Sequence, residues 1–139
     1  GYCKVTSSYF EDYMQNVTMR LIKTEVNPEK ENSVILHDLY YKGHDIVLDF
    51  DRKNPLEPLV SMEEQVCGTT SEAFGTIYGD GNLLMYQPTM YTSYYSTCEK
   101  FVFQYVTLHV DGVGTVGTYA NILEWISDAE AEKLIEEGY

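Results

Sequence analysis

Apolar and polar residues alternate along much of the chain with the two-residue period of a half-buried β-strand. The alternation is strictest at 45–51, where Ile46, Leu48 and Phe50 share one face and aspartates dominate the other. Runs of similar character predict seven further strands, at 17–26, 33–41, 59–67, 72–78, 83–90, 99–110 and 115–126. The pattern therefore predicts a mostly β protein.

Two glycine-rich segments predict turns between these strands. The Gly-Asp-Gly-Asn sequence at 79–82 favours a hairpin, because its residues tolerate a positive φ. Gly112, Gly114 and Gly117 have the spacing G-x-G-x-x-G, which in a strand–turn–helix unit binds dinucleotides. Here the glycines lie between two predicted strands, so a turn followed by a β-bulge is the better interpretation.

At the end of the chain, the hydrophobic pattern changes from the two-residue period of a strand to that of a helix. Ser127 and Glu130 fit a capping box, which predicts a short acidic helix at 128–137.

The strand at 99–110 is apolar on both faces, which favours a closed sheet whose outside is also covered. We therefore expect residues 1–139 to form one all-β domain, a seven- to eight-stranded antiparallel, calycin-like β-barrel with a short C-terminal helix. The outer face of the long strand predicts a homodimer.

Composition and charge exclude several classes of protein. Of the 139 residues, 44% are hydrophobic, so the chain has enough apolar side chains for a core. Nine basic residues stand against 22 acidic ones, which gives a net charge of −13 and argues against binding nucleic acid. No apolar run reaches the ~18 residues that a membrane-spanning helix needs. Thirteen tyrosines are unusual, and tyrosine is typical of strands and ligand-binding surfaces.

Three features favour the secretory pathway. Asn16 begins an Asn-Val-Thr glycosylation sequon, the chain starts without Met, and a cysteine lies at position 3. Cys3, Cys67 and Cys98 allow one disulfide, and the sequence does not choose among the three pairings. Free thiols in a cytosolic protein are the alternative. The cysteine spacings match no zinc site, and no motif indicates a metal or a cofactor.

The segment 73–125 resembles a known family. It contains F-G-x-I-Y-G-D-G-x-L-L-x-Y-Q-P, a long strand and D-G-V-G-T-V-G-T-Y-A-N-I-L. This pattern resembles the allene oxide cyclase and dirigent superfamily of small β-barrels, which includes cyclases and Diels–Alderases of secondary metabolism. The resemblance implies a cofactor-free ring closure. The stretch 91–99 is longer than in that family and the first half of the chain does not align, so the catalytic residues of the cyclases are not transferred.

The candidate site residues come from the predicted strands. His109 shares a strand face with aromatic residues, and if that face points inward, His109 lies at the barrel mouth and could move a proton. Tyr105 and Gln104 are neutral donors that could polarise a conjugated carbonyl. We expect these three residues to be catalytic. A pocket for a hydrophobic substrate is expected from residues on the same and neighbouring strands, namely Tyr78, Tyr86, Gln87, Phe101, Phe103 and Trp125.

Three functions fit these observations. The first is a cofactor-free cyclase or pericyclase that acts on a hydrophobic secondary metabolite inside the barrel, where holding two reacting ends together lowers the entropic barrier. The second is a non-catalytic, lipocalin-like carrier of a small apolar ligand. The third is a secreted β-sandwich whose acidic surface binds basic proteins.

Overall fold

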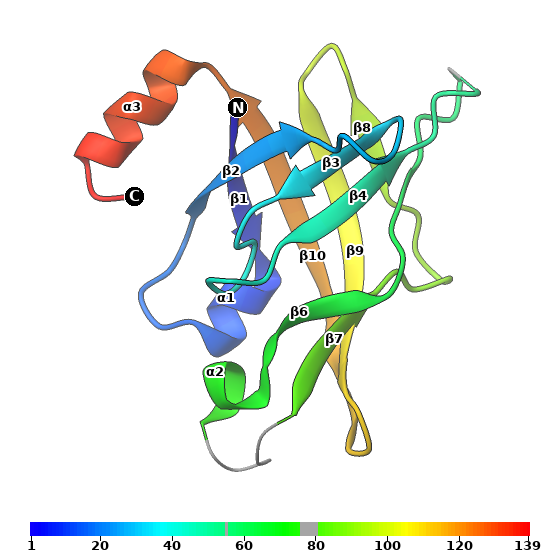
Figure 1. Cartoon of the computed structure of the whole chain (residues 1–139), viewed down its shortest axis with the longest axis vertical. Coiled ribbons are helices and arrows are strands. Elements are labelled where there is room, and N and C mark those ends of the chain that lie inside the picture. Colours follow the sequence, from blue (N-terminus) through cyan, green and yellow to red (C-terminus); the bar gives the residue numbers. More distant parts are fainter. Residues whose placement is uncertain (55, 76–80) are drawn as a thin grey trace.

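The structure is a computed structural model that describes residues 1–54, 56–75 and 81–139. Ten strands form one antiparallel sheet, with three short helices around it (Figure 1). The strands are β1 (Tyr2–Ser7), β2 (Arg20–Val26), β3 (Ser33–Leu36), β4 (Ile46–Phe50), β5 (Val60–Ser61), β6 (Gln65–Thr69), β7 (Asn82–Tyr86), β8 (Tyr94–Ser96), β9 (Phe101–Val110) and β10 (Gly114–Ile126). The helices are α1 (Ser8–Tyr13), α2 (Thr70–Phe74) and α3 (Asp128–Glu136).

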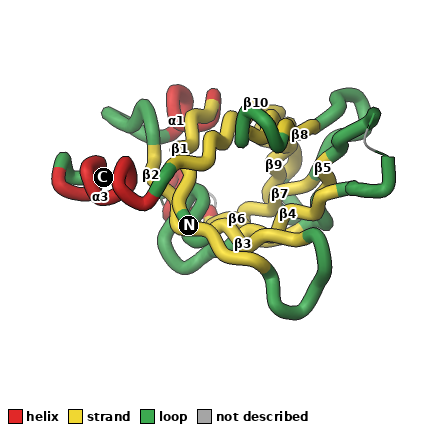
Figure 2. The backbone as a smooth tube through the Cα atoms, turned by 90° about the horizontal axis from the view of Figure 1, so that it is seen from above, coloured by secondary structure: helices red, strands yellow, loops and turns green. Residues whose placement is uncertain are grey.

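The sheet curls into a half-barrel. Its strand order is β5-β4-β3-β2-β1-β10-β9-β7-β6, and β8 pairs with β9 beside this path. Seen from above, the strands curve round the middle of the molecule (Figure 2). The expected all-β fold with a C-terminal helix is thus confirmed in outline, but the strand number is ten, not seven or eight.

Most of the predicted strands are present. The alternating segment 45–51 forms β4, and the two longest predicted strands form β9 and β10. The glycine-rich segment between them is a turn, with φ of 74° at Gly112 and 138° at Gly114, and a register shift follows between Thr115 and Gly117. This confirms the predicted turn and bulge. Two of the four residues of the predicted hairpin at 79–82, Gly79 and Asp80, lie outside the described residues.

Three predicted strands differ from the structure. The segment 33–41 is a strand only over β3 and then turns at Asp38, where φ is 54°. The segment 59–67 is divided into β5 and the first part of β6. The predicted strand at 72–78 is wrong in its described part, because Glu72 and its neighbours belong to helix α2. The Thr69 side chain accepts a hydrogen bond from the Glu72 backbone N–H while the Glu72 carboxylate accepts one from the Thr69 N–H. This capping box fixes the start of the helix.

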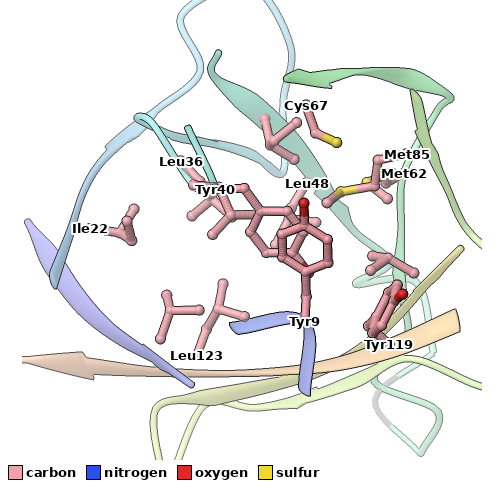
Figure 3. Close-up of a cluster of buried hydrophobic side chains, with 14 of the residues drawn as sticks. Tyr9, Ile22, Leu36, Tyr40, Leu48, Met62, Cys67, Met85, Tyr119 and Leu123 are labelled. Atoms are coloured by element: carbon pink, nitrogen blue, oxygen red, sulfur yellow. The ribbon is translucent and has the colours of Figure 1, made fainter. Parts of the chain in front are cut away.

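Buried side chains occupy the space that the sheet encloses. Tyr9 and Tyr40 lie at the centre of this cluster, with their rings stacked at a centroid distance of 4.5 Å (Figure 3). Aliphatic and sulfur-containing side chains surround them, among them Ile22, Leu36, Leu48, Met62, Cys67, Met85 and Leu123. Gly68 of β6 is needed for this packing, since a Cβ there would lie 2.6 Å from the ring of Tyr41.

Side chains and one isolated bridge join the two ends of the curled sheet. The amide of Gln65 on β6 accepts a hydrogen bond from the Val47 N–H at 2.9 Å and donates one to the Val47 carbonyl at 3.0 Å, so it acts as a strand neighbour of β4. Leu59 forms an isolated bridge with Tyr94, and the Val60 N–H donates to the Ser93 carbonyl at 3.0 Å. These contacts hold the half-barrel curled.

All three cysteines are free thiols, which makes the expected disulfide wrong. Cys3 and Cys67 are fully buried in the core, and burial raises the pKa of each thiol to about 12. Cys98 is exposed between β8 and β9. Among the described residues, no helix is both long enough and apolar enough to cross a membrane.

Candidate functional site at the mouth of the sheet

The register of β9 decides where the predicted site residues lie. Val102, Gln104 and Val106 point into the core and are buried. Neighbouring residues of a strand point to opposite faces, so Tyr105 and His109 lie on the outer side. The aromatic face of β9 therefore does not point inward, and His109 does not lie at the mouth of the barrel.

Gln104 belongs to a buried chain of polar groups. The Tyr40 hydroxyl donates to Asn121 Oδ1 at 2.6 Å, and the Asn121 amide donates to Gln104 Oε1 at 3.3 Å. The Gln104 amide in turn contacts Met62 Sδ at 3.5 Å, and Ser7 Oγ lies 3.2 Å from the Tyr40 hydroxyl. Burial raises the pKa of Tyr40. These buried polar groups provide one another's hydrogen-bond partners inside the core. Their role is therefore to stabilise the fold.

Aromatic side chains lie together on the outer side of β9, beginning with Phe101, Phe103 and Tyr105 of the strand itself. Tyr94 of β8 stacks on Phe103 at a centroid distance of 5.6 Å, and Tyr91 stacks on Tyr105 at 4.8 Å. Tyr91 and Tyr94 are exposed, whereas the three β9 rings are half-buried. We call these five residues the outer aromatic row. It contains two of the predicted substrate-binding residues and one predicted catalytic residue.

His109 and Tyr86 meet in a different place. His109 Nε2 lies 2.6 Å from a carboxylate oxygen of Glu64, and the Tyr86 ring is edge-on to the imidazole at 5.5 Å. These three side chains line a wide, shallow hollow together with Gly114 and Thr115. The Glu64 side chain is 54% exposed and that of His109 is 24% exposed, so the pair lies at the surface. The hollow offers a hydrogen-bonded His–Glu pair beside a single aromatic ring, Tyr86.

The remaining predicted residues are scattered. Gln87 accepts a hydrogen bond from the Met62 N–H at 3.0 Å and thereby fixes the loop after β5. Tyr78 lies outside the described residues. Asn16 is exposed in the loop between α1 and β2, with a φ of 61°. Its glycosylation stays a prediction.

Trp125 lies at one mouth of the half-barrel, in a pocket of about 340 Å³. The pocket walls come from five strands and the loops beside them. They are formed by Val34, Phe50, Arg52, Tyr95, Ser96, Thr97, Lys100, Phe101, Val102 and Trp125. We call this the mouth pocket. It unites two of the predicted substrate-binding residues, Phe101 and Trp125, with Phe50 from the other end of the sheet and with Tyr95 of β8, the strand beside β9.

Hydrogen bonds hold the aromatic walls of the mouth pocket in place. The Trp125 indole N–H donates to Thr24 Oγ1 at 3.2 Å, and the Tyr95 hydroxyl donates to the Asp51 carbonyl at 3.1 Å. Phe50 and Tyr95 meet edge to face with centroids 5.1 Å apart. Because each ring has a fixed partner, the pocket is formed before any ligand enters.

Sequence reasoning missed much of this pocket. Phe50 was on the apolar face of the predicted strand 45–51, and this alternation was a usable signal. Tyr95 lies on β8, which is too short and polar to show a strand pattern, and Arg52 lies in a loop. Within the described residues, no group of three or more His, Cys, Asp and Glu side chains is arranged to hold a metal ion.

Comparisons with known proteins add the family. The fold and pocket define an all-β protein whose curled sheet has a small apolar opening at one end. Residues 1–137 match the family described as "Domain of unknown function (DUF4984)", and the chain belongs to this family. No curated protein and no solved structure matches the chain. The resemblance to the allene oxide cyclase superfamily stays a prediction.

Proposed function

We propose that this protein binds a small, largely apolar molecule in the mouth pocket and does not transform it. The observation that carries the proposal is the set of aromatic rings, Phe50, Tyr95 and Trp125, around a pocket of about 340 Å³. Ligand sites are typically concave and lined by apolar and aromatic side chains with few polar groups. This is the carrier hypothesis, with the ligand at the mouth instead of deep inside the barrel.

A cyclase with its substrate inside the barrel is less well supported. Gln104 is engaged in the buried polar chain, while Tyr105 and His109 lie on the outer side of β9. The three residues expected to act together therefore have no common space for a substrate. Secretion also stays a proposal. An expected disulfide was one of the features that went with it, and the three cysteines are free.

A neutral fluorescent probe tests binding directly. Trp125 is the single tryptophan of the chain and lines the mouth pocket, so a probe that enters the pocket must change its emission. We expect N-phenyl-1-naphthylamine to quench this emission in a saturable manner. Absence of saturable quenching, with the protein folded, would contradict the proposal.

Two substitutions on β3 provide a matched pair. Val34 lines the pocket, whereas Ile35 points to the opposite face of the same strand. Val34→Phe fills part of the pocket, so we expect the probe to bind at least about tenfold more weakly, a loss of ~1.4 kcal/mol. Ile35→Phe adds the same ring outside the pocket and is expected to leave binding unchanged. Equal effects of both substitutions would place the probe elsewhere.

A further inference from the structure

The mouth pocket differs in charge from the rest of the molecule. Its lining contains two basic side chains, Arg52 and Lys100, and no acidic residue. The chain as a whole has nine basic and 22 acidic residues. A purely apolar ligand gains nothing from this local excess of positive charge.

The two cations are available to a ligand. Both residues are exposed, and neither lies within 4.0 Å of a carboxylate in the part of the chain that the structure describes. By contrast, Lys4 is paired with Glu124, and Lys30 with Asp49. Arg52 directly follows Asp51, whose carbonyl accepts the Tyr95 hydroxyl bond, so the arginine backbone is attached to the aromatic wall.

Lys100 is anchored on the other side. The Lys100 carbonyl accepts a hydrogen bond from the backbone N–H of Trp125 at 2.9 Å, and the φ of Lys100 is 56°. The two cations therefore extend from backbone segments that are hydrogen-bonded to two different aromatic residues of the pocket, Tyr95 and Trp125. An anionic group at the rim would meet both of them, while an apolar body would lie against the rings.

We propose that the ligand of the mouth pocket is an amphiphile with an apolar body and a carboxylate. The body lies between Phe50 and Trp125, and the carboxylate lies between Arg52 and Lys100. This inference rests on the proposed function and adds the chemical class of the ligand. The negative charge of the remaining surface repels such a ligand elsewhere, so the pocket is where an anion is favoured.

Three probes of equal chain length separate the two proposals. Octanoate, 1-octanol and octylammonium are titrated while Trp125 emission is recorded. We expect octanoate to bind about tenfold more tightly than 1-octanol, since two exposed cations each contribute a modest attraction. Octylammonium is expected to bind most weakly. The preference for octanoate should decrease as NaCl rises, because salt screens exposed charges.

Substitutions identify the groups responsible. In the double variant Arg52→Gln/Lys100→Gln, the preference is expected to disappear, so that octanoate binds only as well as 1-octanol does in the same variant. Lys53→Gln removes a neighbouring charge that does not line the pocket and should preserve the preference.

The outcomes are distinguishable. If 1-octanol and octanoate bind equally in the unmodified protein, the carboxylate proposal fails and the binding function stands. Tighter binding of octylammonium also overturns it. If none of the three probes changes Trp125 emission, and the neutral naphthylamine also fails, both proposals fall.

Discussion

The hydroxyl of Tyr40 shows how single polar groups stabilise this core. It is buried and donates to Asn121 Oδ1, and Ser7 Oγ lies within hydrogen-bond distance. Tyr40→Phe leaves the Asn121 oxygen without its donor inside the core. We expect the free energy of unfolding to fall by about 1–3 kcal/mol.

Urea denaturation of the variant measures this loss. Tyr94→Phe serves as the control, because Tyr94 is exposed, and its effect should stay within about 0.5 kcal/mol. Equal effects of the two substitutions would show that the buried polar chain contributes no special stability.

The buried thiols make stability depend on alkaline pH. Burial raises the pKa of Cys3 and Cys67 from 9.0 to about 12, and it also raises the pKa of Tyr40. The thiols ionise at a lower pH in the unfolded chain than in the folded protein. The contribution of the buried thiols to the free energy of unfolding is therefore fully present below pH 9 and is lost as the pH rises toward 12. Urea denaturation at several pH values measures this dependence.

A variant separates the thiols from other groups that titrate at high pH. Cys67→Ala removes one buried thiol, and the decrease between pH 9 and pH 12 should become shallower. A slope that is identical in the variant would mean that this thiol is not the cause.

At the scale of the element, Gln65 is the side chain that replaces missing strand pairing. Its amide makes two hydrogen bonds with the backbone of Val47, across the gap between β6 and β4. In Gln65→Ala the Val47 N–H loses its acceptor. We expect this amide to exchange its hydrogen about tenfold faster, which corresponds to roughly one lost hydrogen bond.

Hydrogen exchange followed by NMR resolves the single amide. Gln15→Ala is the matched control, because Gln15 is exposed in the loop before β2. Unchanged exchange at Val47 in Gln65→Ala would contradict the role of this side chain in joining the sheet.

The elements also show what the sequence could predict. β4 was predictable because Ile46, Leu48 and Phe50 share one face, and β9 and β10 were predictable because each is a long run rich in β-branched and aromatic residues. β8 has three residues and owes its strand conformation to pairing with β9, which local sequence does not reveal. The error at α2 was avoidable, since Thr69 and Glu72 carry the spacing of a capping box.

The site was harder to predict than the elements. The residues of β9 are apolar on both faces, so alternation alone does not say which face is inside. The larger aromatic residues were expected inward, yet the enclosed space takes Val102, Gln104 and Val106. Trp125 and Phe101 were predicted to bind a ligand. Their meeting with Phe50 follows from the curl of the whole sheet, and their meeting with Tyr95 follows from the pairing of β8 with β9.

At the scale of the whole molecule, the outer aromatic row predicts self-association. Its five aromatic residues carry no charge, whereas the molecule has a net charge of −13, so contact between copies is least repulsive there. We expect a homodimer at micromolar concentration by light scattering.

A charge placed in the row tests the interface. Phe103→Lys is expected to give a monomer, because it would bury an unpaired charge between the copies. Ala129→Lys adds the same charge on the exposed side of α3 and should leave the dimer intact. A monomeric unmodified protein, or dissociation by both variants, would contradict the interface.

The most direct test of the mouth pocket is to locate a bound ligand by NMR. In a titration with octanoate, we expect the largest chemical-shift changes at the Trp125 indole N–H and at the backbone amides of Val34 and Val102, all of which line the pocket. The amide of His109, in the hollow with Glu64 and Tyr86, should change little. Changes centred on His109, or no changes at saturating octanoate, would contradict the mouth pocket as the binding site.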